Sequence, residues 1–334
     1  FEELLRKTGE FIAETLGTEQ AFVTSGAAAA ISLGTAAVLA GDDRDRMASI
    51  PDTSGFDRNE FVFQRGHDYT YKRCFTLAGG KLVDVGRADG CTVEEMEAGI
   101  GSKTAGIAYF ESGRWGSEWV SLDQAREVAD KHGIKLVVDA AGQIYPLDQF
   151  MRVARTGDVV AFGAKYIGSP HSTGICTGRA ELVESAFLQN FIGFELAGIQ
   201  GLARPYGRPY KTDRGEVMGV AVALRRWFSM NHEERLAVEE DKRSAFARGL
   251  AGTAGVTTSI PKEAQLGPNV TVFIHFDAGI TGIDGHEVIK QLEEGDPPIW
   301  TRTHDDGGSI GIGVQMLSDE EVETVVERLR DIFA

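Results

Sequence analysis

A lysine and an aspartate stand at the ends of two apolar stretches of this chain. Lys165 follows one apolar run and precedes a glycine-rich turn, while Asp139 ends the run Ile134-Lys-Leu-Val-Val. Lys165 is the only charged residue between positions 159 and 170, so its flanks predict a buried or cleft-lining position, where an unpaired ammonium group is costly. A lysine that forms an imine and an aspartate that keeps a pyridine nitrogen protonated are what pyridoxal phosphate (PLP) chemistry requires.

The predicted place of Asp139 in the fold supports this interpretation. The carboxyl ends of parallel strands form the ligand crevice of open α/β sheets, and Asp139 ends such a strand. The alternative is an aspartate that only caps a helix or a turn. Gln143 follows four residues later and is a candidate hydrogen-bond donor to the phenolic oxygen of the cofactor.

Two further strand ends carry candidate residues. Ser25, Gly26 and Ala27 form the turn between a short strand and a helix of small residues. Free N–H groups and the dipole at such a helix start favour a phosphate group, although an ordinary helix start has the same pattern. His67 follows the strand predicted at 60–64. We predict that it lies over the pyridine ring or moves protons; the alternative is a structural histidine.

Three cations are candidates for binding the acid group of a substrate. Arg208 and Lys211 precede a long helix predicted over 215–230, where they either bind a carboxylate or phosphate or pair with nearby acidic residues. Arg302 lies at a predicted strand end, and a guanidinium group there can hold a carboxylate with two hydrogen bonds. The histidines show no HExxH or H-x-x-x-H spacing, so we predict no metal site.

The order of the predicted elements indicates an α/β fold. Helices and strands alternate through the middle of the chain, which is typical of a mostly parallel sheet covered by helices. After a loop over 252–268 the alternation resumes. We therefore predict a large PLP-binding α/β domain over 1–250 and a smaller α+β domain over 251–334. The polar segment 42–60 is predicted to be a long loop.

Composition limits the partners of this chain. It carries 50 acidic against 34 basic residues, a net charge of −16, whereas binding to nucleic acid needs clustered cations. No apolar run reaches the ~18 residues of a membrane span, and the first residues are charged and do not form a signal peptide. We therefore expect a cytoplasmic protein with neither a nucleic-acid partner nor a membrane segment.

Several stretches taken together resemble the PLP-dependent enzymes of fold type I. The similarity covers most of residues 1–230 and is strongest to the group that contains selenocysteine synthase (seryl-tRNA selenium transferase) and D-glucosaminate-6-phosphate ammonia-lyase. It rests on the runs Ala21-Phe-Val-Thr-Ser-Gly-Ala-Ala-Ala-Ala, Gln64-Arg-Gly-His, Gly79-Gly-Lys-Leu-Val-Asp-Val-Gly, Val137-Val-Asp-Ala-Ala-Gly-Gln, Lys165 with Gly168-Ser-Pro-His-Ser-Thr-Gly, and Gly207-Arg-Pro-Tyr-Lys.

The resemblance implies a fold type I PLP-dependent transferase-like fold and a role for each matching residue. Lys165 would be the Schiff-base lysine and the proton carrier at Cα, and Asp139 would pair with the pyridine nitrogen. The other matches would hold the phosphate (Ser25, Gly26 and Ala27), lie over the ring (His67) and approach its 3′ oxygen (Gln143). Members of this fold form dimers or larger homo-oligomers with the site at the subunit interface.

Three departures from the group narrow the expected function. Phe162 stands three residues before Lys165, where relatives often carry a phosphate-binding serine. No Asn-x-x-Gly-like element precedes Phe1, and the acidic chain lacks the basic surface and extension expected of a tRNA-dependent transferase. We therefore expect a small-molecule substrate.

The expected activity is that of a PLP-dependent lyase or transferase. Such an enzyme removes the Cα proton of a small amino acid or amino sugar acid and then eliminates or replaces a β-substituent. A racemase or an aldolase would use the same residues. A non-catalytic relative that binds PLP or another phosphorylated ligand is the rival from a different class. A nucleotide-binding dehydrogenase is disfavoured, because no glycine-rich fingerprint follows a strand.

Overall fold

A computed structural model describes residues 1–113, 115–195, 205–260 and 271–334 of the chain. Contacts divide them into two units, Phe1–Ser229 and Met230–Ala334. The helix over 232–249 falls in the second unit, because Phe246 and the adjacent Leu250 lie in the hydrophobic core of that unit. This division lies about twenty residues before the boundary that we predicted at residue 250.

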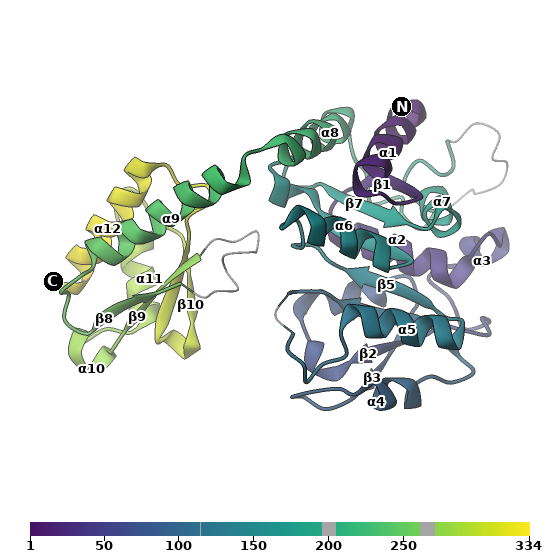
Figure 1. Cartoon of the computed structure of the whole chain (residues 1–334), viewed down its shortest axis with the longest axis horizontal. Helices are drawn as coiled ribbons and strands as arrows, with labels where there is room; N and C mark the ends of the chain where they lie inside the picture. Colours follow the sequence, from purple (N-terminus) through teal and green to yellow (C-terminus); the bar gives the residue numbers. More distant parts are fainter. Residues whose placement is uncertain (114, 196–204, 261–270) are drawn as a thin grey trace. The chain divides into compact units, whose positions relative to one another are not determined.

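A mostly parallel sheet forms the centre of the first unit (Figure 1). Within the described residues it has seven strands in the order β1-β7-β6-β5-β4-β2-β3. β7 is antiparallel to both β1 and β6, and the other neighbouring pairs are parallel. The prediction of a mostly parallel sheet is confirmed. The strands are β1 (Gln20–Thr24), β2 (Glu60–Gln64), β3 (Lys81–Val85), β4 (Thr104–Phe110), β5 (Lys135–Asp139), β6 (Val159–Gly163) and β7 (Gly174–Gly178).

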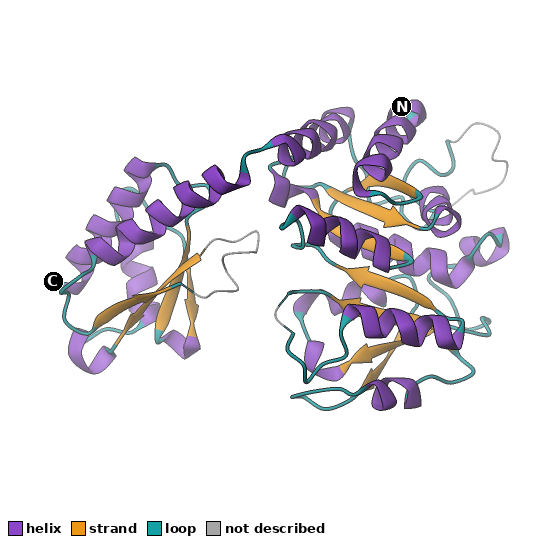
Figure 2. Cartoon of the chain, viewed as in Figure 1, coloured by secondary structure: helices purple, strands orange, loops and turns teal. Residues whose placement is uncertain are grey.

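Helices cover both faces of this sheet (Figure 2). On one face α4, α5 and α6 pack side by side, and on the other α2 packs against α7 and the central strands. The helices of the unit are α1 (Glu2–Leu16), α2 (Ala27–Ala40), α3 (Arg44–Ser49), α4 (Val93–Ala98), α5 (Leu122–His132), α6 (Leu147–Thr156), α7 (Ala180–Leu188) and α8 (Arg214–Ser229). Short 3-10 turns are η1 (Arg65–His67), η2 (Thr70–Phe75) and η3 (Ala164–Ile167).

Close packing explains the small residues of α2. A Cβ atom added at Gly34 would lie only 2.6 Å from Cγ1 of Val159 in β6, so no larger residue fits there without a shift. The residues at the two ends of α5 explain where this helix begins and ends. Ser121 and Gln124 form a capping box at its start, and Gly133 ends it in the left-handed conformation.

Three helices of the first unit, α3, α6 and α7, were not among the predicted elements. α3 interrupts the region predicted to be a loop, and the carboxylate of Asp43 caps it by accepting from the N–H groups of Asp45 and Arg46. α6 buries Phe150 and Val153 against the unit. The polar composition of 42–60 concealed the first helix, since a single cap residue is its main local signal.

The second unit has an antiparallel sheet on which three longer helices pack. Among its described residues the strand order is β10-β11-β9-β8, and residues of α9, α11 and α12 share its hydrophobic core. An α+β unit of this kind was predicted for the end of the chain. Its elements are α9 (His232–Gly249), β8 (Val256–Ser259), β9 (Thr271–Phe276), α10 (Ala278–Thr281), α11 (Gly285–Glu293), β10 (Arg302–His304), η5 (Asp305–Gly307), β11 (Ser309–Gly313) and α12 (Asp319–Phe333).

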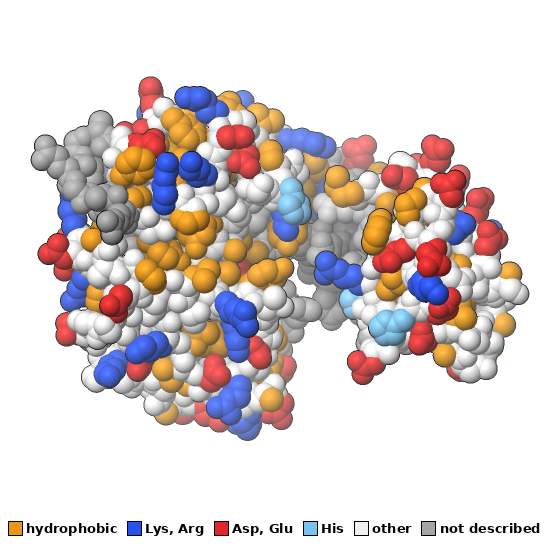
Figure 3. Space-filling view, turned by 180° about the vertical axis from the view of Figure 1, so that it is seen from behind, with side chains coloured by type: hydrophobic (Ala, Val, Ile, Leu, Met, Phe, Trp, Pro, Cys, Tyr) orange, Lys and Arg blue, Asp and Glu red, His pale blue; other side chains and the backbone are white. Residues whose placement is uncertain are grey.

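The surface carries charges of both signs. On the face in Figure 3, acidic, basic and hydrophobic side chains are interspersed over each unit. None of the described helices has the combination of length and hydrophobicity that a bilayer crossing requires.

Candidate active site

One edge of the first unit's sheet collects most of the candidate residues. β1, β6, β5, β4 and β2 all run in the same direction, so their carboxyl ends share this edge. The strands end there at Thr24, Gln64, Phe110, Asp139 and Gly163. The residues that follow within four positions therefore lie along the same edge, namely Ser25, Gly26, Ala27, His67, Gln143 and Lys165, together with Asp139 itself.

Asp139 is a buried carboxylate with a donor on each oxygen. Only 3% of the residue is exposed. Its Oδ1 accepts from the N–H group of Ala141 at 3.1 Å, and its Oδ2 accepts from the hydroxyl of Tyr69 at 2.6 Å. Burial raises the pKa of Asp139, and the two hydrogen bonds oppose that rise. The 2.6 Å separation is typical of a charge-assisted O–H···O⁻ hydrogen bond.

Tyr69 was not among the sequence candidates, yet it is the side chain that contacts Asp139 most closely. Its ring stacks on Phe110 at the end of β4, with ring centroids 3.9 Å apart and an interplanar angle of 2°. Burial, together with the nearby charge of Asp139, raises the pKa of the Tyr69 phenol. The hydroxyl therefore stays protonated and donates to the carboxylate.

Lys165 lies in the turn η3, immediately after β6. The preceding Ala164 and the later Ile167 are buried, as the apolar flanks predicted, but the side chain of Lys165 itself is exposed. Its Nζ lies 5.1 Å from the centroid of the Tyr166 ring. Among the described residues no carboxylate forms an ion pair with this amine, so it is available to react.

The turn before α2 has the features of an anion site. Gly26 has φ 114°, and no side chain caps the helix, so the N–H groups of its first turn have no capping side chain as acceptor. β7 approaches this turn closely: a Cβ atom at Gly174 would lie 2.3 Å from the carbonyl carbon of Gly26 and 2.6 Å from the nitrogen of Ala27. Ser25 and Ala27 are half-buried.

His67 occupies a buried aromatic cluster. Only 1% of the residue is exposed, and its ring stacks on Trp115 with centroids 3.7 Å apart and an interplanar angle of 12°. Burial lowers the pKa of His67 to about 3, and its Nε2 has no hydrogen-bond partner within the part of the chain that the structure describes. The ring is therefore neutral at physiological pH. Its predicted role above the cofactor remains a prediction.

Gln143 lies beside a second buried carboxylate that we did not predict. A Cβ atom at Gly113 would lie 3.3 Å from Oε1 of Gln143, and the N–H of Gly113 donates to Oε1 of Glu111 at 2.8 Å. Burial raises the pKa of Glu111, which is the first residue after β4. A lone glutamate after an apolar strand was the available sequence signal.

Phe162 turns its ring into the protein core. It is fully buried, and it meets Phe150 of α6 edge to face with centroids 4.7 Å apart. This position therefore supplies no hydroxyl group to a phosphate, unlike the serine that relatives often carry there.

Among the described residues, no contact links the three predicted substrate-binding cations to the sheet edge that carries Asp139. Arg208 donates to the carbonyl of Phe191 at 3.0 Å and lies over the ring of Phe194. Lys211 is exposed, and Arg302 belongs to the separate second unit. Their proposed contact with a substrate stays a prediction.

The residues at the edge fit PLP. The cofactor needs a reactive amine, an acceptor for its ring nitrogen and a place for its phosphate, and Lys165, Asp139 and the Gly26 turn offer these at one edge of the sheet. The position next to Asp139 also accommodates a flat six-membered ring with a donor at its tip, because Tyr69 presents such a ring there.

Comparison with known proteins extends the similarity over nearly the whole chain. No family model matches the sequence. The chain is 29% identical over 336 residues to D-glucosaminate-6-phosphate ammonia lyase of Salmonella typhimurium (strain 14028s / SGSC 2262), covering 98% of this chain and 85% of that protein. It is 28% identical over 341 residues to a 5'-C-glycyluridine monooxygenase-decarboxylase of a Streptomyces species, covering 99% and 81% respectively.

Solved structures agree with these relatives. The structure of D-glucosaminate-6-phosphate ammonia-lyase matches with a TM-score of 0.80 and 26% identity, over 99% of this chain and 86% of that one. DesI, solved in the presence of its TDP-sugar product, matches with a TM-score of 0.61 and 17% identity over 99% and 85%, a likeness of fold alone. The chain has the fold of the type I PLP-dependent enzymes, and it resembles D-glucosaminate-6-phosphate ammonia lyase along almost its whole length.

Proposed function

We propose that this enzyme is a lyase that removes the Cα proton of a small amino acid or amino sugar acid, after which the β-substituent leaves. The observation that supports the proposal is that Asp139 ends one parallel strand and Lys165 closely follows the end of its neighbour, at the same edge of the sheet. The full-length likeness to an ammonia lyase favours elimination over racemisation or aldol cleavage, both of which would use the same residues.

Each residue of the edge has a defined task in this reaction. When bound, PLP supplies a conjugated ring that takes up the electron pair left at Cα. Lys165 would hold the cofactor through Nζ, and its amine would then take the Cα proton as a general base. Asp139 would keep the ring nitrogen protonated. Because burial disfavours the charged form of Asp139, a cationic N–H group beside it would stabilise the carboxylate strongly.

The surroundings of Lys165 suit a substrate with a sugar-like body. Tyr69 and Tyr71 meet edge to face with centroids 6.2 Å apart, and Tyr166 lies under the amine of Lys165. Tyrosine rings combine an apolar face with a hydroxyl group, which matches the mixed surface of an amino sugar acid. Arg208, Lys211 or Arg302 would bind its acid group.

The proposal also covers the cofactor, the oligomeric state, the location and the nearest enzyme group. We expect PLP as its cofactor, a homodimer or larger homo-oligomer, and a cytoplasmic location. A kinship with the selenocysteine synthase group, without its tRNA substrate, follows from the motifs around Lys165 and Gly168.

A second candidate function is an oxygen-dependent decarboxylation. It is supported by the likeness to a 5'-C-glycyluridine monooxygenase-decarboxylase, which is as long and nearly as strong as the likeness to the lyase. An oxygen-dependent decarboxylation consumes O₂ and releases CO₂, whereas an elimination consumes no O₂ and releases no CO₂. The two candidates can therefore be separated by their products.

The test is a product screen with the purified, PLP-loaded protein. D- and L-hydroxyamino acids and amino sugar acids are supplied with and without O₂, and ammonia, keto acid and CO₂ are measured. A lyase releases ammonia and keto acid at the same rate in both atmospheres, and Asp139→Asn lowers that rate on the order of 100-fold. Release of CO₂ that stops without O₂ would favour the second candidate, and a protein that shows no visible absorbance band with PLP would overturn both.

A further inference from the structure

The Tyr69 phenol has the shape and the hydrogen bond of a bound pyridine ring. It is a flat six-membered ring, it stacks on Phe110 with an interplanar angle of 2°, and a donor at its tip reaches Oδ2 of Asp139 at 2.6 Å. A PLP ring whose nitrogen donates to Asp139 needs that same carboxylate. A carboxylate oxygen can accept more than one hydrogen bond, so the two rings compete for space: a pyridine ring that approaches Oδ2 along the direction of the Tyr69 hydroxyl needs the place that the Tyr69 ring fills.

We propose that Tyr69 is a latch that occupies the place of the cofactor ring in the cofactor-free enzyme and must leave Asp139 when PLP binds. This inference rests on the proposed function, because it assumes that PLP enters this site. It adds to that function a residue that sets the affinity and the rate of cofactor binding.

The segment that carries Tyr69 allows such a movement. His67 is anchored before it by the stack on Trp115, and Cys74 and Phe75 are buried after it. Between these anchors Asp68, Thr70 and Tyr71 are exposed. A rotation of this short stretch can therefore release the ring while the buried anchors on both sides keep their contacts.

The latch also explains how the cofactor-free protein tolerates a buried carboxylate. Asp139 is 3% exposed, and a buried charge without partners is costly. The Tyr69 hydroxyl satisfies Oδ2 until a ring nitrogen replaces it. Removing the hydroxyl destabilises the cofactor-free state and leaves the PLP-bound state unchanged, so it strengthens the binding of PLP.

The first experiment measures PLP binding to the cofactor-free wild type and two variants by stopped-flow absorbance. Tyr69→Phe removes the hydroxyl and keeps the ring, whereas Tyr69→Leu removes the ring as well. We expect Tyr69→Phe to bind PLP about tenfold more tightly than the wild type, the effect of one hydrogen bond to a charged group, and Tyr69→Leu to bind PLP faster still. The control is Tyr210→Phe, which removes a phenol that is hydrogen-bonded to Tyr206 among the described residues, and it should bind PLP like the wild type.

The second experiment tests the contact without PLP. A double-mutant cycle of Tyr69→Phe and Asp139→Asn in thermal unfolding of the cofactor-free protein should show that the two changes are not additive. Additive changes, or equal PLP binding by the wild type and Tyr69→Phe, would overturn the latch and leave the proposed function intact. Absence of PLP binding in every variant, with the coupling still present, would instead overturn the proposed function and with it the displacement of Tyr69 by PLP.

Discussion

Asp139 at the end of β5 lies directly opposite Ala161 of β6 in the parallel register of the two strands. Lys165 follows Ala161 by four residues, and the turn η3 begins at Ala164, once β6 has ended. This register brings an amine and a carboxylate that are separated by 26 positions in the sequence to the same edge of the sheet. The chemistry that we propose depends on this pairing of strands.

Gly174 is predicted to be essential for the phosphate turn. In Gly174→Ala the new Cβ would collide with the backbone of Gly26 and Ala27, so the turn must shift. We expect the affinity for PLP to fall at least about tenfold and the free energy of unfolding to fall by about 1–3 kcal/mol. The matched control is Gly313→Ala in the second unit, where nothing lies within 4 Å. Equal PLP titrations for the two variants would refute the role of the turn.

His67 is predicted to make the stability of the protein depend on pH. Burial lowers its folded-state pKa from 6.5 to about 3, so the unfolded chain binds this proton at a higher pH than the folded chain does. Its contribution to stability is complete above pH 6.5 and is lost as the pH falls toward 3. Between pH 7 and pH 5 the loss is about 2 kcal/mol.

His67→Phe is the variant that isolates this effect, because it keeps a ring on Trp115 and removes the proton site. Chemical denaturation at pH 7 and pH 5 gives the drop in unfolding free energy for each protein. The drop should be about 2 kcal/mol smaller in the variant. An identical drop in both proteins would mean that folding does not lower the pKa of His67.

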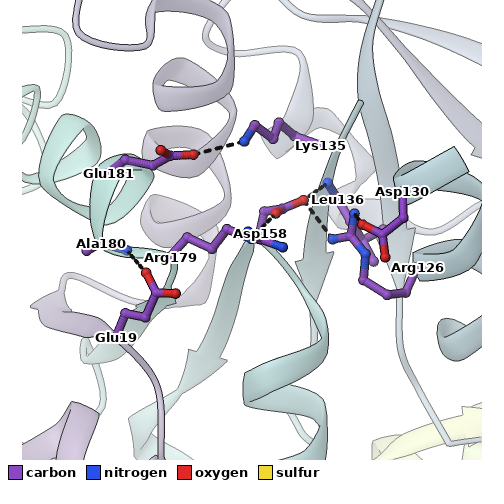
Figure 4. A network of polar contacts seen from close by, with 9 residues as sticks. All are labelled: Glu19, Arg126, Asp130, Lys135, Leu136, Asp158, Arg179, Ala180 and Glu181. Carbon is purple, nitrogen blue, oxygen red and sulfur yellow. Dashed lines mark hydrogen bonds and ion pairs between the residues drawn. The ribbon is translucent and has the colours of Figure 1, made fainter. Parts of the chain in front are cut away.

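Asp158 is predicted to be a major source of stability at the opposite edge of the sheet (Figure 4). Its side chain is 2% exposed and pairs with Arg126 at 2.8 Å and Arg179 at 2.6 Å, while the N–H of Leu136 donates to it at 2.7 Å. Asp158→Ala removes one partner of a buried ion network and should cost about 3 kcal/mol. Thermal or chemical unfolding measures the loss.

The control for Asp158 lies in the same view. Glu181 pairs with Lys135 at 2.9 Å, but the side chain of Glu181 is 68% exposed and that of Lys135 is 38% exposed, so Glu181→Gln should change stability by less than about 0.5 kcal/mol. If the two variants lose the same stability, the buried network around Asp158 contributes no more than a surface pair.

The parts of the site that could be predicted from the sequence are those that depend on local pattern. Apolar strands that end in a polar residue, such as the one before Asp139, predict where strands finish, and parallel strands then bring those ends to one edge. The turn at Gly26 was found in the same way. To predict these features, it is enough to know where a strand lies, where it ends and in which direction its neighbours run.

The parts that were missed depend on packing between distant segments. Tyr69 reaches Asp139 only because its ring stacks on Phe110, which lies 41 residues away, and no local pattern records that contact. The stack of His67 on Trp115 likewise joins two separate segments, and no local pattern indicates it. The division of contacts after Ser229 differs from the limit that we predicted at residue 250, because the helical pattern of α9 does not indicate which core this helix joins.

The identity of the cofactor-bearing lysine can be measured directly. Purified protein loaded with PLP is reduced with borohydride, digested and analysed by mass spectrometry, with Lys165→Ala treated in parallel. We expect a visible absorbance band that disappears on reduction, a pyridoxyl adduct on the peptide that contains Lys165, and neither in the variant. An adduct on another lysine, or full retention of the band and of turnover by Lys165→Ala, would contradict the assignment of Lys165 as the catalytic amine.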